Sequence, residues 1–392
     1  MATSSICGLK SWTSSRGQRK FVTGFYATSN ASQQVSLVWT NPTDSNFVGT
    51  LIVRKTGSYP VKPTDGTKVY AGAAANYTDT GLTNGTQYYY RAFAYNAKTE
   101  YQTSYCVATA IPKGDILAST LPVGAKIKFG KYNDVDIVWN IVDKKHSGYP
   151  SNSVTLMTDK IISLKCFDAA EPNNSNSDRQ SYGNNRYIYS NLRQWLNSTA
   201  AAGQWYTAQH SADAPPNNVN VLTKYNEYDT EAGFLAGFSE NMRAALLSTT
   251  LVVARNTVTD GGASETTTDK IFLASTAEVG LANDGGVVEG TGLAAFSAGV
   301  SRVAYPTAEC VSKSECQASN LNISQPVSYY WLRTPSVSSS YRVLCVNSSS
   351  TIGSIYAADG SMEGLRPFCN LSGDTTFSAN TDSDGCYTFI GG

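Results

Sequence analysis

The side chains most often used in catalysis and metal binding are few in this 392-residue chain and lie apart in the sequence. The two histidines, His146 and His210, have no serine or cysteine partner at a spacing typical of a hydrolase. The eight cysteines form no Cys-x-x-Cys pair, so we expect neither zinc nor thiol-redox sites; they are Cys7, Cys106, Cys166, Cys310, Cys316, Cys345, Cys369 and Cys386. We expect most thiols to be buried and free, with Cys310 and Cys316 close enough in sequence to bond.

Carboxylates offer two further patterns. Glu227 and Asp229 resemble a glycosidase pair, although acidic surface loops often hold such pairs. The oxygen-rich stretches 283–286 ("NDGG") and 380–385 ("NTDSDG") resemble parts of calcium loops, but the second lacks the glutamate that would close such a loop. We therefore predict that the protein is not an enzyme and has no cofactor, with calcium as the alternative.

Residues 336–360, "SVSSSYRVLCVNSSSTIGSIYAADG", contain many serines and only two charged side chains. Tyrosine supplies a large contact area at low entropic cost, and serine and asparagine supply adaptable hydrogen bonds, so this composition is typical of binding loops. Serine-rich loops are also common as idle connections. On the first interpretation, the candidate ligand contacts are Ser336, Ser338, Ser340, Tyr341, Arg342, Cys345, Asn347, Ser349, Thr351, Ser354, Tyr356 and Asp359.

The flanking motifs "YYWLRTP" (329–335) and "GLRPFCNL" (364–371) are typical of packed protein. We expect Trp331 to lie in the core. Arg333 and Arg366 are expected to pair with carboxylates or carbonyls and to hold the ends of the serine-rich stretch as structural anchors.

The overall composition excludes some partners. The formal net charge is zero and only 15% of residues are charged, so nucleic acid and membrane surfaces are not expected partners. The N-terminal residues lack the apolar region of a secretory signal, so we expect synthesis in a cytoplasm without export by that route.

Residues 21–112 alternate short apolar strands with Asn-Gly and Asp-Gly turns, a pattern typical of an antiparallel sandwich. Trp39 and the motif Leu82-x-x-Gly85-Thr-x-Tyr88 resemble the core tryptophan and tyrosine corner of a fibronectin type III domain. The resemblance implies a spacer or docking module. A polar tail (1–20) precedes this domain and a linker (113–120) follows it.

Residues 121–392 mix strands with two helix patterns and predict an α+β domain. A strand pair is expected around Asn133 and Asp134. One helix is expected over 187–198, burying Trp195, and a second after Ser239.

Five motifs in this region occur in a recognisable order. They resemble a lectin-like domain of gut bacteria and their phages, related to the C-type lectin and formylglycine-generating-enzyme folds. They are "FGKYNDVDIVWNIVD", "YIYSNLRQWLNS", "DKIFLASTAEVG", "YYWLRTP" and "GLRPFCNL". The group includes the variable proteins of diversity-generating retroelements, in which a reverse transcriptase randomises template adenines and rewrites a C-terminal ligand-binding stretch.

Adenine randomisation of an asparagine codon never yields Lys, Gln, Glu, Met or Trp, and residues 336–360 contain none of these five types. The resemblance therefore implies a receptor-binding adhesin of a phage virion or tail fibre, with residues 336–360 as the variable region. Such a protein is released by lysis, binds a protein or glycan on a bacterial surface, and attaches to other virion proteins through its N-terminal part. Related tail adhesins form trimers, so a homotrimer is compatible with it, although no coiled-coil heptads enforce one. The alternative is a bacterial surface or structural protein of the same fold without diversification.

Overall fold

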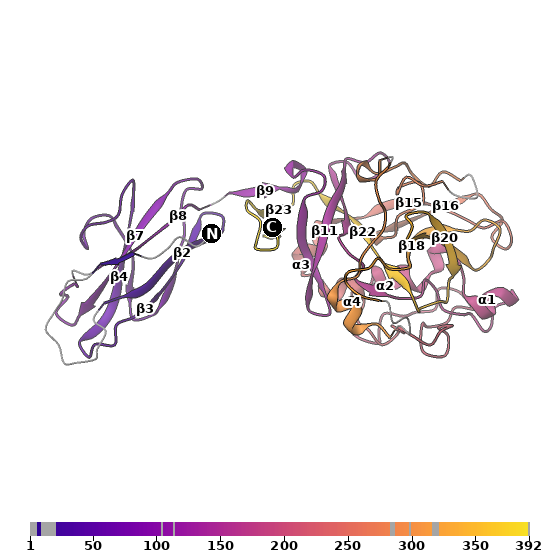
Figure 1. Ribbon diagram of the computed structural model, residues 1–392, viewed down its shortest axis with the longest axis horizontal. Coiled ribbons are helices and arrows are strands. Elements are labelled where there is room, and N and C mark those ends of the chain that lie inside the picture. Colours follow the sequence, from indigo (N-terminus) through magenta and orange to yellow (C-terminus); the bar gives the residue numbers. More distant parts are fainter. Residues whose placement is uncertain are drawn as a thin grey trace. The chain divides into compact units, whose positions relative to one another are not determined.

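The computed structural model describes residues 6–8, 21–102, 105–112, 114–282, 287–297, 299–315 and 321–390. The chain divides into two compact units: Met1–Ile116 with Ser378–Asn380, and Leu117–Phe377 with Thr381–Gly392. Strands outnumber helices, and the helices are short (Figure 1). The prediction of a multidomain, β-rich protein is therefore confirmed at this level.

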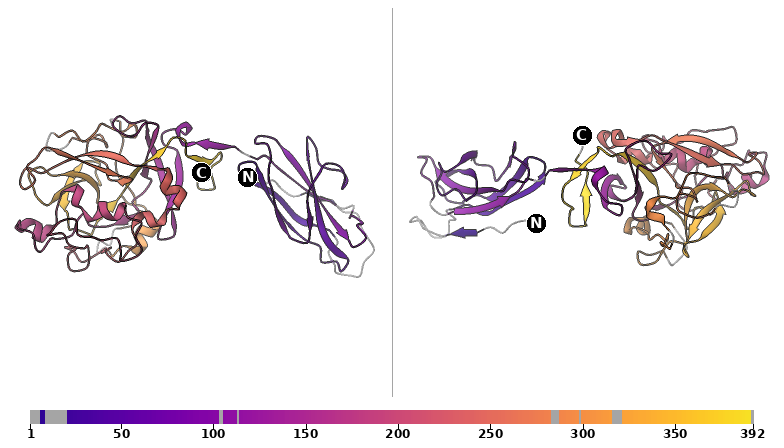
Figure 2. Two further views of the ribbon diagram at one scale, coloured as in Figure 1. Left: turned by 180° about the vertical axis from the view of Figure 1, so that it is seen from behind. Right: turned by 90° about the horizontal axis from the view of Figure 1, so that it is seen from above.

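The first unit contains two antiparallel sheets (Figure 2). One sheet has the order β1-β8-β7-β4-β5, with bounds Ile6–Gly8, Tyr105–Ala110, Tyr88–Asn96, Phe47–Thr56 and Thr67–Gly72. The other has the order β2-β3-β6, with bounds Thr23–Ala31, Gln34–Thr40 and Asn76–Asp79. The short strand β1 belongs to the segment expected as a polar tail, whose other residues lie outside those described.

The core of the first unit joins side chains from both sheets. Phe25 and Trp39 from the three-stranded sheet pack with Tyr90 from the five-stranded one. Tyr88 is buried at its edge, and its hydroxyl accepts the backbone N–H of Thr83 at 3.0 Å. This hydrogen bond ties the start of β7 to the preceding turn.

The segment predicted as a linker (113–120) is only partly a linker. Strand β9 (Asp115–Leu117) is followed by a 3₁₀ turn η1 (Ala118–Thr120), in which Ala118 is buried. The N–H groups of Ala118 and Ser119 donate to the carbonyls of Thr375 and Gly373. Residues 118–120 are therefore a folded part of the second unit.

The second unit has a large mixed sheet of order β14-β22-β12-β11-β10-β24. The bounds of these strands are Leu246–Leu247, Phe368–Ser372, Ser153–Thr158, Val135–Lys144, Lys126–Tyr132 and Cys386–Thr388. Strand β17 (Ile271–Phe272) also pairs with β22, and β23 covers Thr376–Ser378. The predicted pair around Asn133 and Asp134 is confirmed as the β10–β11 hairpin, and both turn residues have positive φ.

A second sheet carries the serine-rich stretch. Its order is β13-β21-β18-β19-β20, with bounds Ser163–Leu164, Glu363–Leu365, Tyr329–Pro335, Arg342–Asn347 and Ile352–Tyr356. A separate hairpin is formed by β15 (Thr249–Ala254) and β16 (Ser264–Asp269). The helices, with the 3₁₀ turns among them, are α1 (Ser177–Tyr182), η2 (Tyr187–Tyr189), α2 (Asn191–Leu196), η3 (Phe234–Gly237), α3 (Glu240–Ala245), η4 (Ala294–Phe296) and α4 (Ala308–Lys313).

The predicted helices are shorter than expected. The helix expected over 187–198 begins only after Ser190, because the Ser190 side chain caps it by accepting the N–H of Arg193. Trp195 is fully buried as predicted. Ser239 caps α3 as predicted, but the helix buries none of its own residues, and the apolar contacts come from the flanking Phe238 and Leu246.

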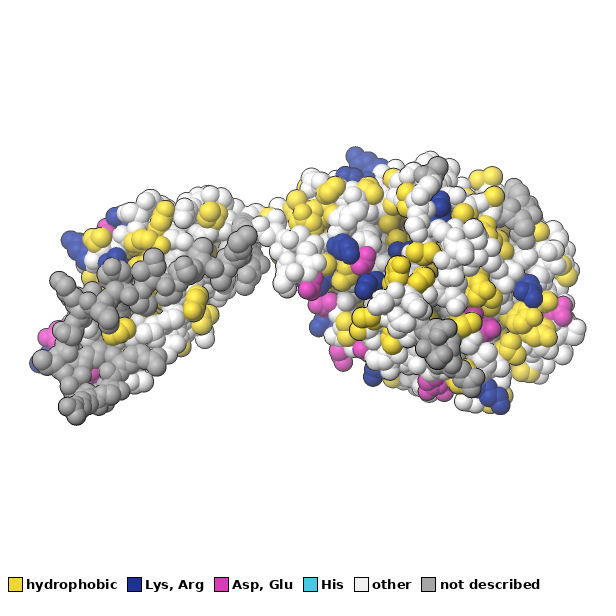
Figure 3. Space-filling view, in the orientation of Figure 1, with side chains coloured by type: hydrophobic (Ala, Val, Ile, Leu, Met, Phe, Trp, Pro, Cys, Tyr) yellow, Lys and Arg dark blue, Asp and Glu magenta, His cyan; other side chains and the backbone are white. Residues whose placement is uncertain are grey.

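The described helices also include none with both the length and the apolar character needed to cross a bilayer. On the face of the second unit drawn in Figure 3, basic and acidic side chains are scattered among uncharged ones.

Candidate functional site

Residues 336–360 form a loop, a hairpin and a return segment at one edge of the second sheet. Strands β19 and β20 pair from Arg342 opposite Tyr356 to Val346 opposite Ile352. At the hairpin tip, the Asn347 side-chain oxygen accepts the backbone N–H groups of Ser349 and Thr351. Local side-chain bonds of this kind shape a turn without a buried core.

Burial divides the predicted contact residues into three groups. Ser338, Ser349 and Thr351 are exposed. The residues of intermediate exposure are Tyr341, Arg342, Asn347, Ser354, Tyr356 and Asp359. The buried residues are Ser336, Ser340 and Cys345, at 7%, 1% and 0% exposure.

The sequence predicts that Ser336, Ser340 and Cys345 contact a ligand, but their side chains lie inside the unit, and this burial does not favour a ligand contact. Ser340 donates through its hydroxyl to Asn176, and its carbonyl accepts from the Arg179 guanidinium at 3.0 Å. Cys345 lies on β19 opposite Gly353 and is fully buried. The four consecutive residues 343–346 of β19 are all buried, so both faces of this strand are covered.

A buried asparagine holds the loop before β19. The side-chain amide of Asn185 donates to the carbonyls of Ser339 (2.7 Å) and Arg342 (2.9 Å). Its oxygen accepts from the Asn256 amide at 2.9 Å. An asparagine with both ends paired is a rigid bridge, and nothing in its local sequence distinguishes it from a surface asparagine.

Three tyrosine rings gather beside the hairpin. The ring centroids of Tyr341 and Tyr356 are 5.6 Å apart, and Tyr182 lies 5.0 Å from the first and 4.6 Å from the second. The Arg342 guanidinium lies 4.5 Å from the Tyr356 ring centroid and donates to the carbonyl of Ser354 at 3.2 Å. We call these four residues the tyrosine–arginine surface.

Sequence reasoning missed Tyr182. It ends α1, and its carbonyl accepts the N–H of Ala358 at 2.8 Å, while the Tyr341 carbonyl accepts the N–H of Ala357 at 2.9 Å. These backbone bonds bring two tyrosines to the return segment after Tyr356. A contact between residues so far apart in the chain leaves no periodic pattern in the sequence.

The flanking anchors are buried and fully engaged. Arg333 is 1% exposed and forms a two-pronged ion pair with Glu278 at 2.6 and 2.7 Å. It also donates to the carbonyls of Leu273, Glu289 and Val252. Burial opposes the charge on Arg333, but the Glu278 carboxylate outweighs it and raises the pKa of the guanidinium.

The other two anchors contact backbone carbonyls. Trp331 is buried, and its indole N–H donates to the carbonyl of Lys165 at 2.8 Å. Arg366 donates to the carbonyls of Thr158 and Asp159. Its guanidinium also lies 5.5 Å from the ring centroid of Tyr330. Both ends of residues 336–360 therefore meet side chains that hydrogen-bond inside the unit.

The family model that matches residues 152–373 is described as "Domain of unknown function (DUF6273)". The match covers more than half of the chain. This protein belongs to the DUF6273 family. The matched range of the DUF6273 domain includes the anchors, all of residues 336–360, and Tyr182.

Two further comparisons add no function. The search of curated proteins finds no match to the chain. A solved structure, "Titin kinase and its flanking domains", matches at 12% identity and a TM-score of 0.20, over 49% of this chain and 35% of that chain. At that score the likeness carries no argument.

The electrostatics of the DUF6273 site do not favour thiol chemistry. Burial raises the pKa of the Cys345 thiol, and the nearby Glu363 carboxylate raises it further, so the thiol stays protonated and unreactive. Cys166, Cys369 and Cys386 are likewise free and buried, and Cys310 is buried, whereas Cys106 is disulfide-bonded. Cys316 lies outside the described residues, so its pairing with Cys310 stays a prediction.

The acidic loops have structural partners where they are described. Asp382 and Asp384 both pair with Lys128, at 2.7 and 2.5 Å. Across the described ranges, no group of three His, Cys, Asp or Glu side chains is placed to hold a metal ion. Residues 283–286 lie outside those ranges, and calcium binding stays a prediction.

The histidines also have partners. The Nδ1 atom of His146 lies 2.7 Å from an Asp143 oxygen, and its Nε2 atom lies 3.2 Å from the Thr291 hydroxyl. These two contacts connect Asp143 on β11 with the segment 287–297. His210 lies 2.9 Å from a Glu171 oxygen. Glu227 and Asp229 precede Glu231, which pairs with the buried Lys165 at 2.5 Å.

Proposed function

We propose that this DUF6273 protein is a ligand-binding adhesin and that the tyrosine–arginine surface is its contact site. The observation that carries the proposal is the gathering of Tyr182, Tyr341, Arg342 and Tyr356 on one partly exposed surface. Tyrosine and arginine dominate the binding energy of many protein interfaces. Arg342 and Tyr356 lie on the paired strands β19 and β20, Tyr341 directly precedes β19, and Tyr182 ends α1.

The first unit acts in this proposal as a fibronectin type III spacer. Its two antiparallel sheets, the buried Trp39 and the bond from the Thr83 N–H to the Tyr88 hydroxyl support that fold. Its N-terminal part would attach the protein to other virion components. This role needs no chemistry from the unit.

The second unit acts as a lectin-like head with a variable region at 336–360. Nine of the twelve predicted contact positions are exposed or of intermediate exposure, which supports a surface whose identities can change without loss of the fold. The protein then serves as a phage virion or tail receptor-binding protein, as a monomer or a homotrimer, with a protein or glycan of a bacterial surface as its ligand. The second candidate is a bacterial surface protein of the same fold without diversification, which uses the same site.

Adsorption of the purified full chain to a panel of gut bacterial strains tests binding. On a strain that the protein binds, Tyr341→Ala and Tyr356→Ala should each reduce affinity at least about tenfold, because an interface tyrosine commonly contributes more than 1.4 kcal/mol. Tyr305→Ala is the matched control, since Tyr305 is 40% exposed and stands outside the surface. If neither Tyr341→Ala nor Tyr356→Ala changes adsorption, the tyrosine–arginine surface is not the contact site.

The neighbouring DNA tests diversification. The proposal predicts a reverse transcriptase gene and a near-copy of codons 336–360 in which adenines fall at the positions that reach solvent. Codons for buried residues such as Cys345 should match the copy without extra adenines. A locus with no such near-copy would rule out diversification and favour the bacterial surface protein of the same fold.

A further inference from the structure

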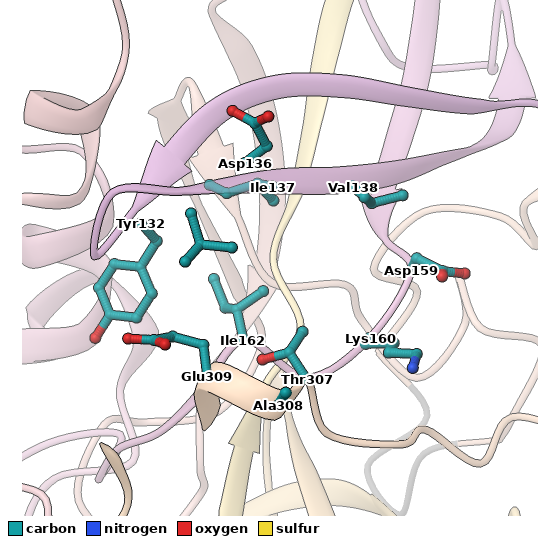
Figure 4. A pocket seen from close by; sticks show the side chains of 11 residues that line it. Tyr132, Asp136, Ile137, Val138, Asp159, Lys160, Ile162, Thr307, Ala308 and Glu309 are labelled. Atoms are coloured by element: carbon teal, nitrogen blue, oxygen red, sulfur yellow. The ribbon is translucent and has the colours of Figure 1, made fainter. Parts of the chain in front are cut away.

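A cleft of about 250 Å³ opens in the second unit, away from the tyrosine–arginine surface and sharing no residue with it. It lies between the β10–β11 hairpin, the segment 159–162 that follows β12, and the start of α4 (Figure 4). Ligand sites for drug-sized molecules commonly measure about 300–1,000 Å³. The volume of this cleft therefore suits a smaller occupant.

The walls of the cleft are mainly apolar. Ile137 and Ile162 are buried at 3% and 6% exposure and form its floor, while Val135 is 48% exposed at the rim. The Tyr132 hydroxyl bonds to Glu231, so this tyrosine offers the cleft only its ring. Such walls fit a chain of methylene groups.

The two ends of the cleft carry opposite charges. Glu309 extends from α4 toward the Tyr132 side, and Lys160 lies on the opposite side (Figure 4). Within the described parts of the chain, no ion pair is found for either side chain. The carboxylate of Asp159, in contrast, is taken by Lys126 at 2.9 Å and Asn140 at 2.8 Å.

We propose that this cleft binds a small zwitterion with an amino group at one end, a carboxylate at the other and an apolar stem between them. The amino group pairs with Glu309 beside the Tyr132 ring, the stem covers Ile137 and Ile162, and the carboxylate pairs with Lys160. Each end meets a charge that the described residues leave uncompensated. An ω-amino acid has this chemistry.

Calorimetric titration of the full chain with three probes of one stem length tests the proposal. The probes are ε-aminocaproate, hexylamine and caproate. We expect ε-aminocaproate to bind at least about tenfold more tightly than either single-ended probe, because each charge-assisted hydrogen bond adds affinity. Equal affinity for all three probes, or no saturable binding of ε-aminocaproate, would overturn the proposal.

Two variants assign the ends. Glu309→Gln should reduce the affinity for ε-aminocaproate to that for caproate, and Lys160→Gln should reduce it to that for hexylamine. Glu240→Gln is the control for the first, because Glu240 occupies the first turn of the equally short α3, as Glu309 does in α4. Lys68→Gln, an exposed change in the first unit, is the control for the second. If the test variants keep the affinity of the controls, the assignment is wrong.

Discussion

Arg333 and Arg342 lie on paired strands of one sheet and have opposite surroundings. Arg333 on β18 is 1% exposed and makes five hydrogen bonds, two of them to the Glu278 carboxylate. Arg342 on β19 is partly exposed, stacks on Tyr356 and donates to the Ser354 carbonyl. An arginine thus hydrogen-bonds the buried anchor segment together on β18, whereas an arginine on the neighbouring strand β19 is partly exposed to solvent.

The difference teaches how a stable fold can carry a replaceable surface. Removal of a buried guanidinium whose donors are all paired is strongly destabilising, since it leaves the partner carboxylate buried without a countercharge. A guanidinium on an aromatic ring at the surface contributes little to the fold and keeps donors for a ligand. The structural arginine lies on β18 and the partly exposed arginine lies on the neighbouring strand β19.

The largest expected effect comes from breaking the frame. Arg333→Ala should lower the free energy of unfolding by about 3–5 kcal/mol, because it leaves Glu278 buried without its countercharge. Urea denaturation measures the loss. The double variant Arg333→Met with Glu278→Gln should recover part of it, and a single variant as stable as the parent would contradict the frame.

Two serines of the same stretch give the next effect. Ser340→Lys should cost about 1–3 kcal/mol, because the buried site beside Asn176 has no room for the longer side chain. Ser349→Lys at the exposed hairpin tip should stay within about 0.5 kcal/mol. Equal costs in thermal or urea unfolding would refute the division by burial.

The free energy of unfolding should depend on pH through Glu363, which follows the serine-rich stretch 336–360. Burial raises the pKa of Glu363 well above its ordinary value of 4.5, and neighbouring Asp359 raises it further. With the folded-state pKa raised, this carboxyl stabilises the fold fully only below pH 4.5, and the contribution is lost as the pH rises through the folded-state pKa. Glu363→Gln should therefore flatten the fall in unfolding free energy between acidic and neutral pH, whereas the exposed Glu240→Gln should not.

The smallest effect on stability is expected at the surface arginine. Arg342→Ala should change the free energy of unfolding by no more than about 0.5 kcal/mol while weakening ligand adsorption. A loss of stability comparable to that of Arg333→Ala would mean that both arginines belong to the frame.

The sequence predicted the parts that depend on local patterns. The β10–β11 hairpin, the cap at Ser239 and the buried Trp331 all follow from alternation, turn residues or apolar character. The burial of Ser340 does not follow from such patterns, because serine is mostly exposed in folded proteins and this one is buried by its contacts with Asn176 and Arg179.

The rest of the site depends on contacts between distant segments. Tyr182 reaches Tyr356 only because α1 hydrogen-bonds to the segment after β20, and Asn185 is a bridge only where two loops meet it. Neither residue has a local pattern that marks it. The motif order pointed to the stretch, and three-dimensional pairing selected the residues within it.

The most direct test of the account is a substitution scan of residues 336–360 in the full chain, with folding and ligand adsorption read separately. Substitutions at Ser338, Ser349 and Thr351 should leave folding intact, and those at Tyr341, Arg342 and Tyr356 should reduce adsorption in protein that still folds. Substitutions of Ser340 and Cys345 by larger or charged residues should lower the free energy of unfolding. If tolerance along the stretch shows no relation to exposure, or adsorption survives loss of both tyrosines, the account is contradicted.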